Sequence, residues 1–145
     1  DQLMAKLLPE RLFACQMSTS MMERAVELTV QYSKEREIFS RSLMNYQNTQ
    51  FTLAECAAKA QIARTFTDTL ALNYMKGQDI SIEVSMGKQW ICDMANEVSS
   101  KCLQLFGGYG FCGEYEISRI YCDSRVMSIL AGSSEVMKLI VSRGL

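Results

Sequence analysis

The sequence has no histidine and a single proline among its 145 residues. The lack of histidine excludes serine–histidine and cysteine–histidine nucleophile pairs and every metal site that needs an imidazole ligand. Any acid–base chemistry must therefore come from a carboxylate, a lysine, a tyrosine or a cysteine, and no metal site is expected. The scarcity of proline leaves few obligatory helix breaks and favours long helices.

Neither sign of charge is in excess, since 15 basic residues face 16 acidic ones and the formal net charge is −1. No stretch is basic enough to indicate a nucleic-acid or anionic-membrane partner. No apolar run reaches the length that a membrane-spanning helix needs. The sequence begins Asp1-Gln2-Leu3, without an initiator methionine or a signal-peptide pattern. We interpret this as a piece of a longer protein.

The six cysteines include no C-x-x-C pair, and most stand among apolar residues within helical patterns. We expect reduced thiols that act as small buried hydrophobic residues. They are Cys15, Cys56, Cys92, Cys102, Cys112 and Cys122.

Apolar residues recur at helical spacing over most of the chain, and no strand-like alternation is found. We expect one domain over residues 1–145 that belongs to the all-α class. Short connections between long helices make neighbours antiparallel, which predicts an up-down four-helix bundle with an additional short C-terminal helix. The expected helices cover residues 9–36, 46–75, 80–106, 114–126 and 132–143.

Proline and glycine mark the expected helix ends. Pro9 is expected at the start of the first helix, where its missing N–H costs nothing. Gly77 should cap the end of the second helix, and the pair Gly107-Gly108 should stop the third. Several apolar residues lie off the main stripes, which predicts that second faces are covered by another domain or subunit. These residues are Phe13, Met17, Met21, Leu28 and Trp90.

Two glycine-containing segments indicate contact with a large polar ligand. The first runs from Gln104 to Phe111 and contains the glycine pair; the second is Ala131-Gly132-Ser133-Ser134-Glu135. Glycine lets a ligand or another backbone approach closely. A helix that starts with serine presents N–H and hydroxyl groups suited to an anion or an oxygen. A plain helix stop and a plain N-cap are the structural alternatives.

Four segments in register along the whole chain resemble the C-terminal helical domain of the acyl-CoA dehydrogenase family. They are Pro9-Glu10-Arg11-Leu12, Arg36-Glu37-Ile38-Phe39 leading to Gln47, the segment 104–111, and the segment 131–135. The resemblance implies an FAD enzyme that removes a proton from Cα of an acyl-CoA thioester and passes a hydride from Cβ to the flavin. The product would be a trans-2-enoyl-CoA. An N-terminal helical domain and a middle β-domain would precede this one.

The resemblance also implies which residues contact FAD. Arg36 matches an arginine that pairs with the FAD pyrophosphate of a neighbouring subunit, and a guanidinium suits phosphate oxygens. Serine stands at position 40, where the family usually has glycine after the phenylalanine, which puts the turn after Phe39 in question. The cofactor-binding residues implied are Arg36, Phe39, Gln47, Gln104, Gly107, Gly108, Ser133, Ser134 and Glu135.

The resemblance places the catalytic base at Glu10. Many family members carry a glutamate immediately before the glycine that is Gly132 here, but this chain has Ala131 there. Long-chain and isovaleryl-type members instead place the base in a Glu-Arg-Leu context near the start of the first long helix, as in Glu10-Arg11-Leu12. The Ala131 backbone N–H would stabilise the enolate oxygen. Arg11 and Gly132 are implied on the substrate side. The alternative for Glu10 is a carboxylate in a first helical turn.

The resemblance implies an acyl-CoA substrate, electron-transfer flavoprotein as electron acceptor, and a homodimer or homotetramer. The location would be cytoplasmic in a bacterium and the mitochondrial matrix in a eukaryote. The fragment alone is expected to be inactive. Two alternatives stay open: an acyl-CoA oxidase-like flavoprotein, and a helical assembly scaffold without chemistry. A scaffold has no need for Arg36, Gln47 and Gln104 at these spacings.

Overall fold

The computed structural model describes residues 2–145, with side chains described from residue 7 onward. Long helices make up most of it, and α1, α2 and α3 contain 34, 29 and 26 residues. The elements are α1 (Gln2–Glu35), β1 (Glu37–Ile38), β2 (Arg41–Ser42), η1 (Leu43–Asn45), α2 (Gln47–Met75), α3 (Ser81–Phe106), η2 (Gly107–Phe111), α4 (Glu116–Met127) and α5 (Ser134–Ser142).

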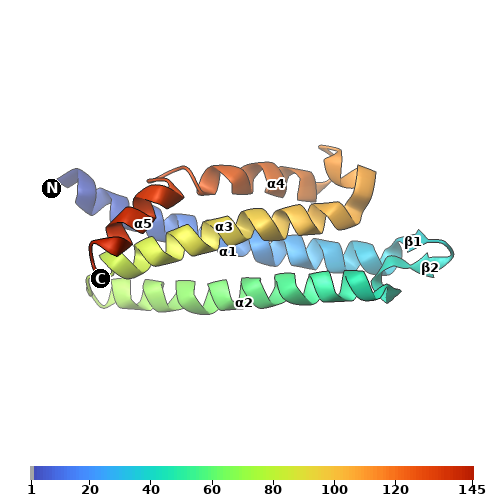
Figure 1. The fold of residues 1–145 in the computed structure, drawn as a ribbon, viewed down its shortest axis with the longest axis horizontal. Coiled ribbons are helices and arrows are strands. Elements are labelled where there is room, and N and C mark those ends of the chain that lie inside the picture. Colours follow the sequence, from blue (N-terminus) through green and yellow to red (C-terminus); the bar gives the residue numbers. More distant parts are fainter. Residues whose placement is uncertain (1) are drawn as a thin grey trace.

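The helices form the predicted up-down bundle. α1 and α3 run in the same direction and lie side by side along the middle, with α2 on one side and α4 on the other, both running the opposite way (Figure 1). The short helix α5 packs against the first half of α3. The β1–β2 hairpin and η2 therefore lie at one end of the bundle, and α5 lies towards the other. The predicted fold class is confirmed.

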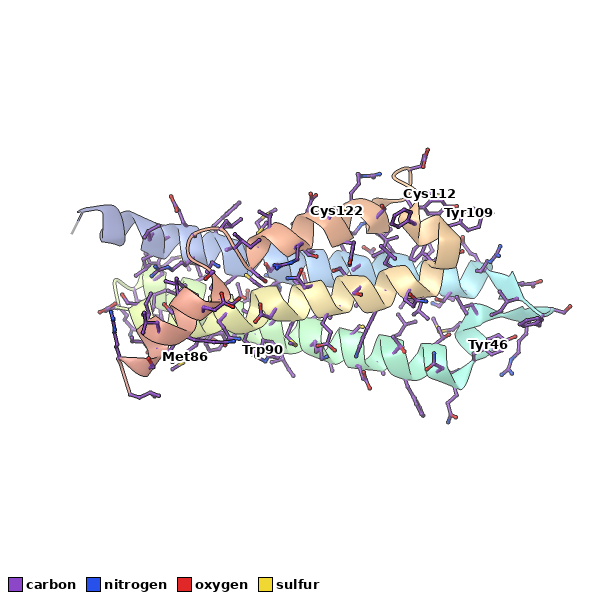
Figure 2. The ribbon with its side chains drawn as sticks, turned by 45° about the horizontal axis from the view of Figure 1, so that its top comes forward. Tyr46, Met86, Trp90, Tyr109, Cys112 and Cys122 are labelled. Carbon is purple, nitrogen blue, oxygen red and sulfur yellow. The ribbon has the colours of Figure 1, made fainter. Side chains whose placement is uncertain are left out.

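Small residues make the bundle core compact. On α2 the buried positions recur at intervals of three and four, which is the expected apolar stripe. Alanine and cysteine along this stripe let α1 and α3 approach closely. Among the cysteines, the prediction of burial is right for Cys15, Cys56, Cys92 and Cys102 and wrong for Cys112 and Cys122, which are exposed. Cys112 follows η2 and Cys122 lies on the outer face of α4, where no helix packs against them (Figure 2).

The predicted start of the first helix is wrong. α1 begins at Gln2, so Pro9 lies in its interior and removes one helical hydrogen bond. Leu8 packs against the core immediately before the proline. Glu10 is consequently an interior helix residue and not a carboxylate in a first turn. The expected ends at Gly77 and Gly107 are confirmed, because both glycines follow a helix with positive φ angles, of 72° and 60°.

A small hairpin between α1 and α2 was not predicted. Ile38 pairs with Arg41 across a two-residue turn in which Phe39 and Ser40 have φ angles of 49° and 59°. This is the pattern of a type I′ turn, which usually favours glycine or asparagine. The turn therefore forms although Ser40 replaces the family's glycine. The Ser42 hydroxyl ties the hairpin to α1 by donating to the carbonyl of residue 33, at 3.0 Å.

The off-stripe apolar residues divide into two groups. Met21 and Leu28 pack against the bundle's own core, so the prediction of an external cover is wrong for them. Phe13, Met17 and Trp90 stay exposed, with 61%, 36% and 37% of their surfaces accessible. Their cover remains a prediction. Among the residues that the structure describes, no helix is both long and apolar enough to cross a membrane.

Candidate functional site

A groove of about 630 Å³ opens at the hairpin end of the bundle. The end of α1, the hairpin, the start of α2 and the junction between α3 and η2 form its walls. Figure 2 shows Tyr46 and Tyr109 at this end of the molecule, the first just ahead of α2 and the second on η2. Four predicted cofactor residues line the groove: Arg36, Gln104, Gly107 and Gly108.

Arg36 is the cation of this groove. Its guanidinium lies 5.6 Å from the centre of the Tyr109 ring, and the side chain is exposed. Within the described residues no carboxylate lies within ion-pair distance of it, and the groove's described lining contains no aspartate or glutamate. Backbone hydrogen bonds of 2.8 Å to Tyr32 and Leu43 fix the position of the residue. An unpaired, positioned guanidinium suits a phosphate group.

An aromatic wall stands beside the arginine. Tyr32 and Phe106 stack with ring centres 4.1 Å apart, and Tyr115 meets Phe106 edge-on at 6.0 Å. The Tyr32 hydroxyl donates to the Phe106 carbonyl at 3.3 Å. Burial raises the pKa of Tyr32 above its ordinary value, so it stays a neutral hydrogen-bond donor at neutral pH. The wall is rigid and apolar, which suits a planar ring held next to a phosphate.

The glycine pair contains two different kinds of glycine. Gly107 has a φ of 60°, and the chain needs glycine there to end α3. Gly108 has no positive φ, and a Cβ built on it meets no atom within 4 Å. Neither backbone conformation nor packing within the chain accounts for Gly108. Space in front of its backbone is what a closely approaching ligand requires.

Two of the predicted cofactor residues lie outside this groove. Phe39 is at the hairpin tip with 95% of its surface exposed. Gln47 is the first residue of α2 and is exposed beside the groove, while its neighbours Tyr46 and Asn48 line it. Their cofactor roles remain predictions.

The second glycine segment forms a tight turn between α4 and α5. Ala131 and Gly132 have φ angles of 53° and 105°, so two successive residues lie in the left-handed region. The φ of 105° favours glycine at position 132, and a Cβ there would also come within 2.8 Å of the terminal methyl group of Met137. Helix α5 begins at Ser134 and not at the predicted Gly132.

Ser133 is the N-cap residue of α5, but its side chain makes no cap hydrogen bond. The backbone N–H of Glu135 and the Ser133 hydroxyl lower the pKa of Glu135 below its ordinary value. The predicted trio Ser133, Ser134 and Glu135 lines a polar hollow of about 320 Å³. Ser134 is buried there, and its hydroxyl donates to Asp93 at 2.8 Å.

A hydrogen bond joins α1 to the turn that contains Ala131. Arg11 is buried on α1, and its Nε donates to the Ala131 carbonyl at 3.3 Å. Glu10 is the next residue on the same helix and is exposed. Within residues 2–145 the Ala131 N–H makes no backbone hydrogen bond. The bond from Arg11 thus places the residue next to Glu10 beside the turn that contains Ala131.

Sequence reasoning missed the polar residues of α3 that hold this turn. Lys88 is fully buried and donates to the Gly132 carbonyl at 2.7 Å. Asp93 accepts from the hydroxyls of Ser128 and Ser134, at 3.0 and 2.8 Å. A usable signal was present, because Lys88 stands four residues after Val84, on the apolar stripe of this helix. A charged residue at such a position is rarely buried without a partner.

The groove and the turn form two separate half-sites. Asp93 beneath the turn and Gln104 at the groove are eleven residues apart on α3, which is about 17 Å along the helix axis. The structure therefore brings Arg11 together with Ala131 and Gly132, and Glu10 is the neighbour of Arg11 on α1. It places Arg36, Gln104 and the glycine pair at the groove.

Comparisons with known proteins show which family the chain resembles. A mouse mitochondrial long-chain specific acyl-CoA dehydrogenase is 37% identical over 142 residues, which are 97% of this chain and 33% of that protein. Subunit CarC of the caffeyl-CoA reductase-Etf complex of Acetobacterium woodii is 30% identical over 132 residues, 91% of this chain and 35% of its own length. The crystal structure of an acyl-CoA dehydrogenase from Geobacillus kaustophilus superposes with a TM-score of 0.95 and 43% identity, over 98% of this chain and 37% of that one.

The chain thus spans about a third of the length of the relatives that it matches. The model of the acyl-CoA dehydrogenase C-terminal domain matches residues 1–145, the whole of the chain. The helical bundle and these matches together show that the chain belongs to the acyl-CoA dehydrogenase family, as its C-terminal domain.

Proposed function

We propose that this domain supplies the catalytic base and part of the FAD site for the α,β-dehydrogenation of an acyl-CoA thioester. The observation that carries the proposal is the hydrogen bond from Arg11 to the Ala131 carbonyl. It joins the Glu10-Arg11-Leu12 segment of α1 to the turn at which many relatives carry a glutamate. Since Ala131 has no carboxylate, Glu10 is the base at this junction.

The reaction divides between a proton and a hydride. Glu10 accepts the proton from Cα of the thioester, and the Ala131 N–H donates to the carbonyl oxygen on which negative charge develops. Bound FAD supplies the acceptor for the hydride that leaves Cβ. Arg11 positions the two parts of the site, because its hydrogen bond to the Ala131 carbonyl sets the distance between α1 and the turn. The product is a trans-2-enoyl-CoA.

The groove at the hairpin end fits one half of an FAD molecule. The unpaired Arg36 suits the pyrophosphate, and the aromatic wall of Tyr32 and Phe106 beside Gly108 suits a planar ring close to the backbone. Gln104 adds a polar side chain on the same surface. Gln47, Phe39, Ser133, Ser134 and Glu135 complete the proposed set of FAD contacts.

The separation of the two half-sites supports an oligomer. Because the groove and the catalytic turn lie far apart on one chain, we propose that the groove contacts the FAD of a neighbouring subunit in a homodimer or homotetramer. The isolated domain then carries only half-sites, and we expect it to fold without activity. One relative is a subunit of an Etf complex, which supports electron-transfer flavoprotein as the redox partner.

The direction of the reaction has a second candidate. The relatives include a caffeyl-CoA reductase subunit and a 3-(aryl)acrylate reductase, so the same site could run as an enoyl-CoA reductase. In that direction Glu10 would deliver a proton to Cα.

A relative from mitochondria and several from bacteria support the mitochondrial matrix or the bacterial cytoplasm as the location of this protein.

Replacement of Glu10 by glutamine in the full-length enzyme tests the proposal. The change keeps size and hydrogen bonding but removes basicity, so flavin reduction by acyl-CoA should slow by roughly 10²–10⁴-fold. Stopped-flow bleaching of the oxidised flavin band measures this rate. FAD content and substrate binding should change little. Glu27→Gln, an exposed glutamate on the same helix, is the matched control and should leave the rate unchanged.

A second substitution tests the geometry. Ala131→Glu places a carboxylate on the turn and should restore part of the rate in the Glu10→Gln background. A Glu10→Gln enzyme that reduces its flavin at the wild-type rate would show that Glu10 is a surface carboxylate. The base would then have to come from another part of the full-length protein.

A further inference from the structure

Lys88 is the largest side chain that the described core encloses completely. It lies on α3, next to Gly87, and none of its surface is exposed. Its ammonium donates to the Gly132 carbonyl at 2.7 Å and to the Met127 carbonyl at 3.2 Å. These two carbonyls lie at opposite ends of the turn between α4 and α5. Lys88 therefore joins the end of α4 to the residue that follows Ala131.

The surroundings of Lys88 give it little compensation for burial. Two thiols are its near neighbours, Cys15 and Cys92, and burial raises the pKa of both, so they stay uncharged. Burial also lowers the pKa of Lys88, and Arg11 nearby acts in the same direction. Asp93 accepts hydrogen bonds from two serines of the turn, and among the described residues it makes no ion pair with Lys88. An apolar side chain would pack here at lower cost.

Backbone groups on both sides of the peptide that carries the Ala131 N–H are held by hydrogen bonds. The Leu130 N–H bonds the Val126 carbonyl at 3.0 Å, Arg11 holds the Ala131 carbonyl at 3.3 Å, and Lys88 holds the Gly132 carbonyl. The peptide group that carries the Ala131 N–H lies between these anchored groups. Ala131 also keeps a left-handed φ of 53°, which an alanine does not adopt readily. Such strain persists only where the surroundings impose it.

We propose that Lys88 is a positioning residue, which through its hydrogen bonds to the Gly132 and Met127 carbonyls holds the Ala131 N–H towards the thioester oxygen. The inference rests on the proposed oxyanion role of that N–H. It adds a residue that touches neither substrate nor FAD and yet sets the rate of proton abstraction. Its effect should be specific to ligands that carry a thioester oxygen.

Lys88→Met tests the inference in the full-length holoenzyme. Methionine fills most of the volume of lysine but has no donor. Two ligands serve as probes: 3-thiaoctanoyl-CoA, whose sulfur at position 3 prevents hydride transfer, and the matching thioether that lacks the carbonyl oxygen. Isothermal titration calorimetry gives the Kd of each. Because Glu10 takes the Cα proton of this bound thioester, its oxygen carries negative charge, and the wild-type enzyme should prefer the thioester to the thioether by about tenfold to a hundredfold, the usual worth of donors to a charged oxygen.

The expected result is that Lys88→Met loses at least about tenfold of this preference while its affinity for the thioether stays unchanged. Flavin reduction by octanoyl-CoA should slow by roughly a hundredfold, as misplacement of a reacting group does. Lys59→Met is the matched control, because Lys59 pairs with Glu97 on the bundle surface. This control should change neither the preference nor the rate. If Lys88→Met does not fold, Lys88→Gln is the fallback, because glutamine keeps a hydrogen-bond donor but carries no charge. Its ratio of thioether Kd to thioester Kd should lie between those expected for wild type and Lys88→Met.

Two results would overturn the inference, and they differ. A folded Lys88 variant with the wild-type preference and rate shows that the lysine has a purely structural role, and it leaves the proposed function intact. A wild-type enzyme without any preference for the thioester shows that the Ala131 N–H does not bind the oxygen. In that case the proposed oxyanion role fails, and the role of Lys88 fails with it.

Discussion

Gly107 and Gly108 should respond in opposite ways to the same substitution. Gly107 has a φ of 60° and ψ of −138°, a conformation that alanine adopts only at a cost on the order of 1–3 kcal/mol. Gly108 has no positive φ and open space around the position of a Cβ. Alanine at Gly108 should leave the fold as stable as before or stabilise it by about 0.4–1 kcal/mol, because alanine restricts the unfolded chain.

FAD affinity should respond differently from stability, because Gly108→Ala should weaken FAD binding without destabilising the fold. If FAD lies against the Gly108 backbone, a methyl group there must displace the cofactor or the chain, and overpacking of this kind costs about 1–3 kcal/mol. The Kd for FAD should then rise by roughly 5- to 150-fold. Gly108→Ala would be a variant that folds at least as well as wild type and retains its flavin less well. No defect of folding could explain such a loss.

The assay combines urea denaturation of the full-length apoprotein with FAD titration by flavin fluorescence. Arg36→Ala serves as positive control, because it removes the unpaired guanidinium of the groove without touching the core. Its FAD affinity should fall and its stability should not. A Gly108→Ala protein with the wild-type Kd for FAD would refute the reasoning and would reduce the glycine pair to a helix stop.

Two further predictions concern stability. Ser40→Gly should relieve the left-handed φ of 59° in the hairpin turn and raise the free energy of unfolding by up to about 1 kcal/mol in urea titration, whereas Ser20→Gly inside α1 should lower it. Hydrogen bonds from Lys59 and Lys101 lower the pKa of Glu97 below its ordinary value of 4.5. That stability is present above pH 4.5 and is lost as the pH falls through the lower, folded-state pKa. Glu97→Gln should flatten the loss of stability below pH 4.5, by no more than about 1 kcal/mol for so exposed a pair.

Helix content and topology could be predicted because they depend on local patterns. The stripe of α2 and the stops at Gly77 and Gly107 are encoded by residues near one another in the sequence. The start of α1 could not be predicted in this way. Proline at position 9 has a strong local meaning, but the contact of Leu8 with the core lies in tertiary structure. The hairpin was missed for a similar reason, since two residues per strand give no alternation to detect.

The sequence predicts which residues belong to the candidate site but not which of them lie close together in space. The family motifs name Glu10, Ala131 and Arg36, yet nothing in their order indicates which of them lie together. The contact between Arg11 and Ala131 joins residues 120 positions apart. Lys88 was missed because the buried face of α3 was predicted from its apolar residues alone, and Lys88 is the one charged residue among the buried residues of that helix.

Helix α3 connects the parts of this site. Its first half carries Lys88 and Asp93, which hold the catalytic turn, and its end leads through Gln104 into the glycine pair of the groove. A straight, buried helix keeps these two half-sites at a constant separation. If the groove binds the FAD of a neighbouring subunit, each α3 also sets the distance between two active sites of the oligomer. A change at the groove end of α3 should then weaken FAD binding at one active site, and a change at its Lys88 end should slow proton abstraction at the other.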